Sequence, residues 1–380
     1  MNQDIQLSGA EMARYARHIT IPEFGLEGQK KLKQAKVLVI GSGGLGSPVL
    51  LYLAAAGVGT IGIVDFDTVD ESNLQRQILF NVNDVGHSKA ETAKSRLEAL
   101  NPHINIIVYK TRFTRENALE LVSQYDVVAD GTDNFPTRYL VNDACVLAGK
   151  VNVYASIFQF EGQVSVFNFL NADGTRGPNY RDMFPEPPPP GLVPNCAEGG
   201  VLGVLPGIIG SMQASEVIKV VTGVGEPLAG RLFLFDAASF TTRILKVQKS
   251  PATKITELIN YEQFCGIKPP AEKRAVKEVS VQELHELFEQ SVDFQLIDVR
   301  EPHEYAVANL DGELIPLATV AGAAHRISKN KKVIVHCRSG VRSANAIREL
   351  EDLFGFDNLY NLKGGILAWS KEIDSEVPAY

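Results

Sequence analysis

The sequence is poor in cysteine and contains no closely spaced cysteine pair. Its 380 residues include four cysteines, which are Cys145, Cys196, Cys265 and Cys337. Disulfide frameworks and cysteine-based zinc sites use clustered or paired cysteines, so this spacing favours neither. Each cysteine must therefore be judged by its immediate neighbours.

An excess of positive charge and a long uninterrupted hydrophobic run are also missing. The formal net charge is -8, which gives no general attraction to nucleic acid or anionic lipid. The most apolar stretch expected to be helical, residues 203–221, is interrupted by Gln213, Glu216 and Lys219, and residues 1–11 are polar without a signal-like core. We therefore expect a cytoplasmic protein that neither spans a membrane nor binds nucleic acid.

The sequence does contain a glycine-rich turn between a hydrophobic strand, residues 36–40, and a helix. The turn carries Gly41, Gly43, Gly44 and Gly46. Glycines let the backbone approach a phosphate, and a helix start, expected here at Ser47 and Pro48, favours an anion through its amides and dipole. We expect this helix to end at Gly57. The strand, turn and helix together predict a nucleotide-binding sheet.

A polar cluster after the second strand indicates which nucleotide binds. The cluster consists of Asp65, Asp67, Asn73, Arg76, Gln77 and Lys89. Side chains of both signs can bind a ribose, a divalent cation and a triphosphate together, which favours ATP over a nicotinamide dinucleotide. An NAD-dependent oxidoreductase stays as a rival interpretation. Lys89, expected in a helix of residues 87–100, has an exposed surface lysine as its alternative.

Two further polar positions accompany this motif. A capping-box spacing precedes a helix that carries Arg14 and Arg17 one turn apart, where they can either meet phosphate or form an exposed face. Asp133 follows the strand of residues 126–130, at the edge where open α/β sheets place their sites. It is a candidate to hold a metal ion, and a local helix cap is the alternative.

The hydrophobic pattern of the middle of the chain predicts a mixed sheet. Residues 104–109 and 126–130 read as buried strands, whereas residues 151–169 include period-two alternation and indicate antiparallel edges. The proline-rich segment 183–204 cannot form a regular element and leads to a helix. Cys196 near its end would be accessible there, although a lone cysteine before a helix is often a small packing residue.

Together these motifs resemble the MoeB/ThiF family, relatives of ubiquitin-activating enzymes. The resemblance rests on G-S-G-G-L-G, D-F-D-T-V, N-L-Q-R-Q, G-T-D-N, P-P-P-P-G and N-C-A-E-G-G-V-L-G-V-L-P-G, and it covers roughly residues 8–247. It implies a homodimer that binds ATP with Mg²⁺ and adenylates the C-terminal glycine of a ubiquitin-like sulfur-carrier protein. We expect an α/β fold with a Rossmann-like nucleotide-binding sheet and an antiparallel extension, over residues 1–248.

The resemblance also implies roles for individual residues. Those that would bind ATP are Gly41, Asp65, Asn73, Arg76 and Lys89. Asp133 would organise Mg²⁺, Arg17 would reach the phosphates of the neighbouring subunit, and Cys196 matches the thiol that the family carries in this loop. Cations beside the departing pyrophosphate would stabilise its developing charge.

The sequence departs from the family pattern where a structural zinc site is common. The first of two C-x-x-C pairs would fall on Asn179 and Asp182, and the second region, residues 248–256, contains no cysteine. Asn and Asp do not replace thiolates in a tetrahedral zinc site of that kind. We therefore predict that structural zinc is absent.

A second chemical motif lies far along the chain, after a linker of residues 249–275 in which we expect a short helix at residues 255–264. H-C-R-S-G-V-R-S places Cys337 between a buried strand and a helix. The loop residues are Arg338, Ser339, Gly340, Val341 and Arg342. Backbone amides, a helix dipole and two arginines would depress the pKa of the thiol and stabilise a persulfide anion. The C-x4-R loop is one residue shorter than that of tyrosine phosphatases and suits sulfur better than a phosphate ester.

With L-I-D-V-R-E and G-G-I-L-A-W, residues 276–380 resemble a rhodanese domain, a small α/β unit. Asp298 and Arg300 match its first motif and are expected to form a structural ion pair. The usual glycine-and-proline turn after E-x-x-E-Y is replaced by A-N-L-D-G-E-L, which would alter the rim that faces the sulfur donor. Either a cysteine desulfurase or thiosulfate would supply the sulfur.

The two halves combine into one hypothesis. ATP would activate the carrier's terminal Gly-Gly carboxylate, a Cys337 persulfide would attack it, and Cys196 would release the thiocarboxylate by forming a disulfide with Cys337. Three rivals stay open: the NAD-dependent oxidoreductase, a non-enzymatic persulfide carrier or scaffold, and a conjugating activator that keeps its carrier as a thioester on Cys196.

Overall fold

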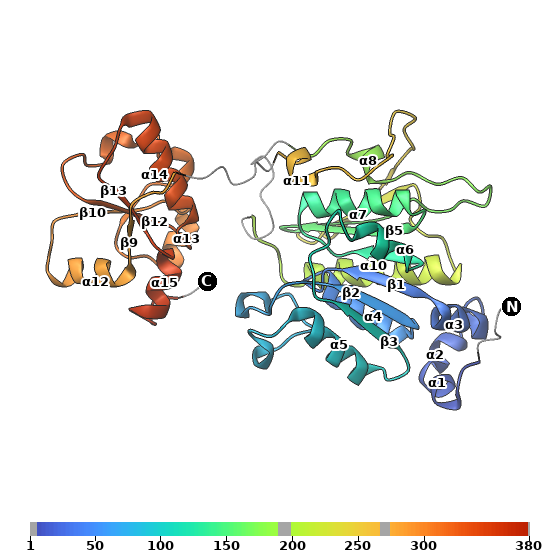
Figure 1. The fold of residues 1–380 in the computed structure, drawn as a ribbon. Helices are drawn as coiled ribbons and strands as arrows, with labels where there is room; N and C mark the ends of the chain where they lie inside the picture. The colour runs from blue at the N-terminus through green and yellow to red at the C-terminus, as the bar shows by residue number, and fades with distance from the viewer. Residues whose placement is uncertain (1–5, 189–198, 267–273, 379–380) are drawn as a thin grey trace. The chain divides into compact units, whose positions relative to one another are not determined.

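The chain folds as two compact units, Met1–Pro269 and Pro270–Tyr380. The structure is a computed structural model and describes residues 6–188, 199–266 and 274–378. Each unit has its own sheet, helices and hydrophobic core (Figure 1). Within the described ranges, no helix is long and apolar enough to cross a membrane.

The first unit is built on a sheet that is parallel on one side and antiparallel on the other. Its strands are β1 (Lys36–Ile40), β2 (Thr60–Val64), β3 (Asn105–Tyr109), β4 (Val127–Asp130), β5 (Val151–Phe158), β6 (Glu161–Phe167), β7 (Arg231–Asp236) and β8 (Thr241–Lys246). Their order is β3-β2-β1-β4-β5-β6-β7-β8. The strands from β3 to β5 run parallel, and β6, β7 and β8 add antiparallel pairings. The mixed sheet expected from the alternating pattern of residues 151–169 is confirmed.

Helices cover both faces of this sheet (Figure 1). They are α1 (Gly9–Arg14), α2 (Ala16–Ile19), α3 (Gly25–Gln34), α4 (Gly46–Ala56), α5 (Lys89–Leu100), α6 (Ala118–Ser123), α7 (Phe135–Leu147), α8 (Tyr180–Met183), α10 (Leu205–Thr222) and α11 (Tyr261–Phe264). Successive β1 side chains point to opposite faces. Val37 and Val39 therefore join the core beneath α4 and α10, while Leu38 and Ile40 join the core beneath α6 and α7.

Three of the expected helix boundaries are wrong. Arg14 and Arg17 do not share one helix, because Tyr15 separates α1 from α2 with φ -96° and ψ 11°. Helix α4 begins at Gly46 rather than at Pro48, although it ends as expected before Gly57. The helix expected at residues 255–264 is confined to α11.

The second unit is a smaller parallel sheet in the order β11-β10-β12-β13-β9. Its strands are β9 (Glu278–Val279), β10 (Gln295–Asp298), β11 (Glu313–Leu314), β12 (Val333–His336) and β13 (Leu359–Leu362). Its helices are α12 (Val281–Glu289), α13 (Pro302–Val307), α14 (Val341–Phe354) and α15 (Gly365–Glu372). The second small α/β unit expected from the sequence is confirmed.

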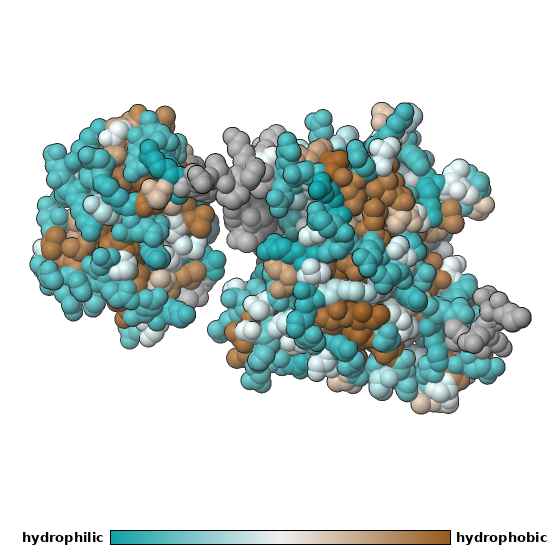
Figure 2. All heavy atoms as spheres, in the orientation of Figure 1, coloured by the Kyte–Doolittle hydropathy of each residue, from teal (hydrophilic) through white to brown (hydrophobic). Residues whose placement is uncertain are grey.

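The visible surface of both units is largely hydrophilic, with separate hydrophobic patches among the polar side chains (Figure 2). Exposed apolar side chains of the first unit include Tyr52, Ile78, Val82 and Val204. Scattered apolar residues are normal on a protein surface, so these positions by themselves define no binding site.

Candidate functional site

A cavity of about 680 Å³ opens where β1, β2 and β4 end. Strand β1 lies between β2 and β4. The chain adds β2 and β3 on one side of β1 and then returns to add β4 on the other side. Open α/β sheets bind ligands at such a switch point, outside the carboxyl ends of the strands. The predicted residues that line the cavity are Gly41, Gly43, Gly44, Asp65, Asp67, Arg76, Gln77, Lys89 and Asp133.

The glycine turn after β1 is closely packed against its own backbone. Gly41 has φ +88°, a conformation that side-chain-bearing residues rarely adopt. A Cβ on Gly46 would lie 2.0 Å from the Gly41 carbonyl oxygen. The turn therefore needs glycine at both positions, and it brings the start of α4 directly to the cavity.

Asp65 connects the end of β2 to this turn. Its Oδ2 accepts hydrogen bonds from Ser42 N at 2.8 Å and Ser42 Oγ at 2.7 Å, and its Oδ1 accepts one from Asp67 N at 2.9 Å. A carboxylate held by three donors fixes the two strand ends relative to each other. Asp65 thus positions the glycine turn besides lining the cavity.

Lys89 is a buried cation at the cavity rather than an exposed surface lysine. It is the first residue of α5, is 6% exposed, and its Nζ lies 3.3 Å from Asp67 Oδ2. The alternative interpretation of Lys89 as a solvated side chain is therefore wrong. Gln77 is also buried, and its Oε1 has no hydrogen-bond partner among the described residues.

Asp133 lies on the cavity wall with an exposed side chain. Helix α7 is capped by Asn134, whose side chain accepts a hydrogen bond from Thr137 N at 3.0 Å. The start of α7 is thus capped by Asn134 and not by Asp133. Asp130, by contrast, is fully buried, and burial raises the pKa of its carboxyl against the opposing pull of Arg138.

Two predicted residues among those that the structure describes do not join the cavity lining. Asn73 ends a short 3-10 helix, Glu71–Asn73, and Arg17 is exposed on α2; neither lines the cavity of its own chain. Cys196 lies outside the described residues.

Sequence reasoning missed an aromatic and a cationic residue at this site. The Arg112 guanidinium lies 3.8 Å from the centre of the Phe66 ring, and both residues line the cavity. Phe66 stands between the two predicted carboxylates of D-F-D, and Arg112 follows β3 at the same edge of the sheet. Extending the search to residues after every parallel strand would have found both.

The residues that stand where a zinc site is common form a hydrogen-bonded cap instead. Asn179 N donates to Asp182 Oδ2 at 2.8 Å at the start of α8. Asp182 Oδ1 accepts from Ser250 N at 3.0 Å, which links this turn to residues 248–256. Within the part of the chain that the structure describes, no group of three or more His, Cys, Asp or Glu side chains is arranged to hold a metal ion.

In the second unit, Cys337 directly follows β12 and lies in a loop closed by α14. Its side chain is nearly fully buried, and its Sγ accepts a hydrogen bond from Gly340 N at 3.2 Å. Ser343 Oγ lies 3.4 Å from the sulfur and 2.6 Å from Asn361 Oδ1. The Gly340 amide and the start of α14 lie at the sulfur, an arrangement that stabilises an anion.

Helix α15 orients the loop from behind. Ile366 N donates to the Cys337 carbonyl oxygen at 3.0 Å, and Leu367 N donates to that of Arg338 at 3.1 Å. A Cβ on Gly365 would lie 2.4 Å from the Cys337 carbonyl oxygen. These contacts hold the start of the loop against the start of α15. A second cavity, of about 750 Å³, borders the loop at Ser339, Gly340 and Val341.

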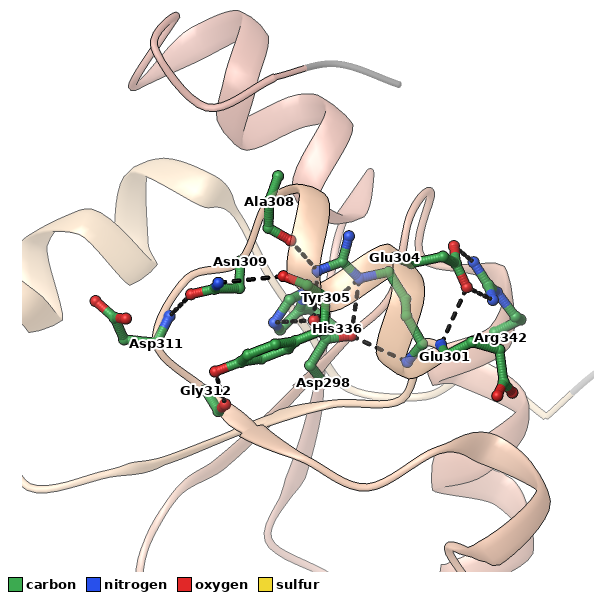
Figure 3. A network of polar contacts seen from close by, with 11 residues as sticks. Asp298, Glu301, Glu304, Tyr305, Ala308, Asn309, Asp311, Gly312, His336 and Arg342 are labelled. Atoms are coloured by element: carbon green, nitrogen blue, oxygen red, sulfur yellow. Dashed lines mark hydrogen bonds and ion pairs between the residues drawn. The ribbon is translucent and has the colours of Figure 1, made fainter.

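The polar network beneath this loop joins β10, α13 and β12 (Figure 3). Arg300 Nε donates to Asp298 Oδ1 at 2.9 Å, and Arg300 Nη2 donates to the Ala308 carbonyl oxygen at 2.7 Å. Asp298 and Arg300 are fully buried and form the ion pair that the sequence predicted. The altered turn continues from Ala308 through Asn309 to Gly312, whose carbonyl oxygen accepts from Tyr305 OH at 3.0 Å.

The remaining described cysteines are placed for packing rather than reaction. Cys145 and Cys265 are buried. Burial raises the pKa of Cys145 well above its ordinary value and that of Cys265 to about 11. Both thiols are therefore protonated and poorly nucleophilic at neutral pH.

The sequence matches two family models. Residues 15–256 match the ThiF family, and residues 280–372 match the rhodanese-like domain. A protein of Mycobacterium tuberculosis named probable adenylyltransferase/sulfurtransferase MoeZ is 50% identical over 381 residues, covering 98% of this chain and 96% of that protein. The sulfur carrier protein adenylyltransferase of Thermus thermophilus is 52% identical over 265 residues, covering 68% of this chain and 98% of that protein.

Two further comparisons extend the likeness. Adenylyltransferase and sulfurtransferase MOCS3 of Aedes aegypti is 41% identical over 399 residues, covering 99% of this chain and 90% of that protein. The crystal structure of E. coli MccB with MccA-N7isoASN matches with a TM-score of 0.57 and 23% identity, over 66% of this chain and 75% of that one. At that identity the structural match concerns the fold alone.

Proposed function

The chain belongs to the ThiF family and carries a rhodanese-like domain, and from this premise we propose that it makes a protein thiocarboxylate in two steps. It adenylates the C-terminal glycine of a ubiquitin-like sulfur-carrier protein with ATP, and it then transfers sulfur from a Cys337 persulfide. We assign adenylation to residues 1–248 and sulfur transfer to residues 276–380, joined by the linker 249–275.

One observation carries this proposal: the same chain holds a nucleotide-type cavity and a cysteine whose sulfur accepts a backbone amide at the start of a helix. The cavity lies at the switch point of a parallel sheet and combines a glycine turn with cations and carboxylates. The Cys337 loop is built to hold an anionic sulfur. The names of the relatives, adenylyltransferase and sulfurtransferase, describe the same pair of activities.

In the first step, a carboxylate oxygen of the carrier attacks the α-phosphorus of ATP, and the bond to pyrophosphate breaks. Arg76 and Lys89 lie at the cavity to neutralise charge that develops on the phosphates. Arg17 is exposed and does not line the cavity of its own chain, so in a homodimer it is available to the phosphates of the partner. Asn73 would complete the contacts to ATP from the segment between β2 and α5.

Mg²⁺ would accompany ATP, and Asp133 would be its protein ligand. Mg²⁺ is commonly held by one or two carboxylates together with substrate phosphates and water, so the exposed Asp133 carboxylate on the cavity wall fits this role. The ion would polarise the phosphates and neutralise their charge. Asp65 and Gln77 would orient the nucleotide.

In the second step, the terminal sulfur of the Cys337 persulfide attacks the acyl carbon, and AMP leaves with the bonding electrons. The product is an acyl disulfide between the carrier and Cys337. A Cys196 thiolate would then attack the Cys337 sulfur, which releases the carrier thiocarboxylate and leaves a Cys196–Cys337 disulfide. A thiol reductant would regenerate both cysteines.

A Cys337→Ala variant separates the two steps. With ATP, a carrier ending in Gly-Gly and a persulfide donor, we expect pyrophosphate exchange at the wild-type rate and no thiocarboxylate, because alanine has no thiol to carry the persulfide. Cys265→Ala, which removes a buried protonated thiol, serves as the control and should make thiocarboxylate normally. Thiocarboxylate formation by the Cys337→Ala variant, measured by intact mass of the carrier, would contradict the proposal.

A further inference from the structure

We propose that Glu304 determines which sulfur donor the Cys337 loop accepts. By holding Arg342 in an ion pair, Glu304 keeps the rim of the loop from binding small oxyanion donors such as thiosulfate, so that the sulfur comes from a protein persulfide. This inference rests on the proposed function of Cys337 and decides between the two donor classes that the sequence left open.

The contact between Glu304 and Arg342 is a two-bond pair. Arg342 Nη1 donates to Glu304 Oε2 at 2.7 Å, and Nη2 donates to Oε1 at 2.7 Å. Figure 3 shows the two side chains facing each other from α13 and the start of α14. The side chains are 13% and 34% exposed, respectively. Paired planar groups of this kind satisfy both charges, so the Arg342 guanidinium is already occupied by an anion of the protein.

Glu304 is held in place by its own helix. Its Oε2 also accepts from Glu301 N at 3.1 Å, as part of a capping box at the start of α13. Burial alone would raise the pKa of Glu304, but the hydrogen bonds from Arg342 and Glu301 N outweigh burial and lower it. The carboxylate is therefore ionised at neutral pH and remains opposite Arg342.

The buried contacts of Arg300 fix the position of this ion pair relative to the Cys337 loop. Arg300 connects Asp298, at the end of β10, to Ala308, just after α13. Strand β10 pairs with β12, which leads directly into Cys337. The position of Glu304 is thus set by the same strands that set the position of the sulfur.

The charge at the rim matters because of the chemistry of thiosulfate. The Cys337 thiolate would attack the outer sulfur of thiosulfate, the S–S bond would break, and sulfite would leave with the electron pair and two negative charges. Arg342 is the fifth residue after Cys337, and the Glu304 carboxylate cancels its charge. A dianion entering here must displace that carboxylate or accept its repulsion.

A protein persulfide makes no such demand. The Cys337 thiolate attacks the terminal sulfur of the donor persulfide, the donor S–S bond breaks, and the donor cysteine leaves as a thiolate. No sulfonate group has to be neutralised at any stage. A neutral Glu304–Arg342 rim is therefore compatible with this donor.

The test measures persulfide formation on Cys337 in the full-length chain at a series of thiosulfate concentrations, by the mass of one added sulfur atom. For Glu304→Gln we expect the half-saturating thiosulfate concentration to fall about fivefold, or about 1 kcal/mol, which is the size expected for a partly exposed charge pair. Asp293→Asn is the matched control. It removes a carboxylate paired with Lys331 at 2.7 Å, before the amino ends of β10 and β12. The half-saturating thiosulfate concentration of this variant should equal that of wild type.

Two arginine variants make the test independent of the folding of Glu304→Gln. Arg342→Gln leaves the Glu304 carboxylate without its guanidinium and should raise the half-saturating thiosulfate concentration. The double variant Glu304→Gln/Arg342→Gln should not show the fivefold fall expected for Glu304→Gln alone. An unchanged value in both single variants would overturn the inference, as would a Glu304→Gln chain that unfolds like wild type and takes no sulfur from thiosulfate. Neither result touches the proposed function, which fails only if the Cys337→Ala chain still makes thiocarboxylate.

Discussion

His336 lies directly before the reactive cysteine and is fully buried. Both ring nitrogens lack a hydrogen-bond partner among the described residues, and its Nε2 lies 3.7 Å from Asp298 Oδ2, too far for a hydrogen bond. Burial lowers the pKa of His336 to about 4 against the opposing pull of Asp298. The imidazole is therefore neutral at pH 7 and acts as a packing residue under the loop.

This burial predicts how the second unit responds to acid. Between pH 6.5 and about 4 the unfolded chain binds a proton on His336 that the folded chain does not, so stability is full above pH 6.5 and is lost as the pH falls toward 4. The fall in pKa from 6.5 to about 4 corresponds to about 3 kcal/mol. Urea unfolding of wild type and His336→Leu at pH 7 and pH 4.5 would measure it.

Comparing wild type with His336→Leu separates the effect of His336 on stability from the effect of the carboxylates that titrate in the same pH range. We expect His336→Leu to lose less stability than wild type on acidification, because an apolar side chain of similar size cannot be protonated. His325→Gln, which replaces an exposed histidine, should lose as much as wild type. Equal acid sensitivity of wild type and His336→Leu would show that His336 is protonated in the folded state.

At the level of elements, local patterns located the strands better than the helix starts. Strands β3 and β4 each begin one residue later than expected and end where expected, because a buried run of branched residues is a strong local signal. The break between Arg14 and Arg17 had no such signal. Tyr15 is buried there, and its hydroxyl accepts a hydrogen bond from Asn101 Nδ2 at 2.8 Å, a contact across 86 residues of sequence.

The same contrast holds for the two sites. Asp65, Lys89 and Cys337 were found because each follows or precedes a recognisable element. Arg112 and Glu304 were missed because their roles depend on which segments the fold brings together. Arg112 reaches Phe66 only through the pairing of β2 with β3, and Glu304 reaches Arg342 across 38 residues.

The glycine turn between β1 and α4 gives a prediction for a whole element. Gly46→Ala places a Cβ 2.0 Å from the Gly41 carbonyl oxygen, so the turn must open and α4 must shift. We expect the free energy of unfolding of the first unit to fall by about 2–3 kcal/mol and ATP binding to weaken more than tenfold. Thermal unfolding and nucleotide titration would measure the two effects.

Gly43→Ala is the matched control for this turn. The nearest heavy atom to a Cβ there is Gln77 Nε2 at 3.5 Å, an ordinary contact. Its stability should therefore stay within about 1 kcal/mol of wild type, even though it lies in the same cavity wall. If both variants were equally stable, close packing of the Gly46 backbone would not be what fixes the turn.

For the whole molecule, the cores of the two units are separate. Among the described residues, each cluster of buried apolar side chains draws its members from one unit only. Three clusters lie within Met1–Pro269 and two within Pro270–Tyr380. Units with their own cores generally unfold as independent cooperative transitions. The cavity assigned to ATP is lined entirely by the first unit.

Saturating ATP with Mg²⁺ should therefore stabilise one transition and not the other. A ligand at about 100 times its Kd adds about 2.7 kcal/mol to the unit that binds it, which for a unit of this size raises its Tm by about 5–10 °C. Differential scanning calorimetry of the full-length chain should show two transitions, with only the one of the adenylation unit moving. The transitions can be assigned with His336→Leu, which should change the pH dependence of the Tm of the second unit alone. A single transition, or equal movement of both with ATP, would mean that the two units share a stabilising interface and that adenylation and sulfur transfer are energetically coupled.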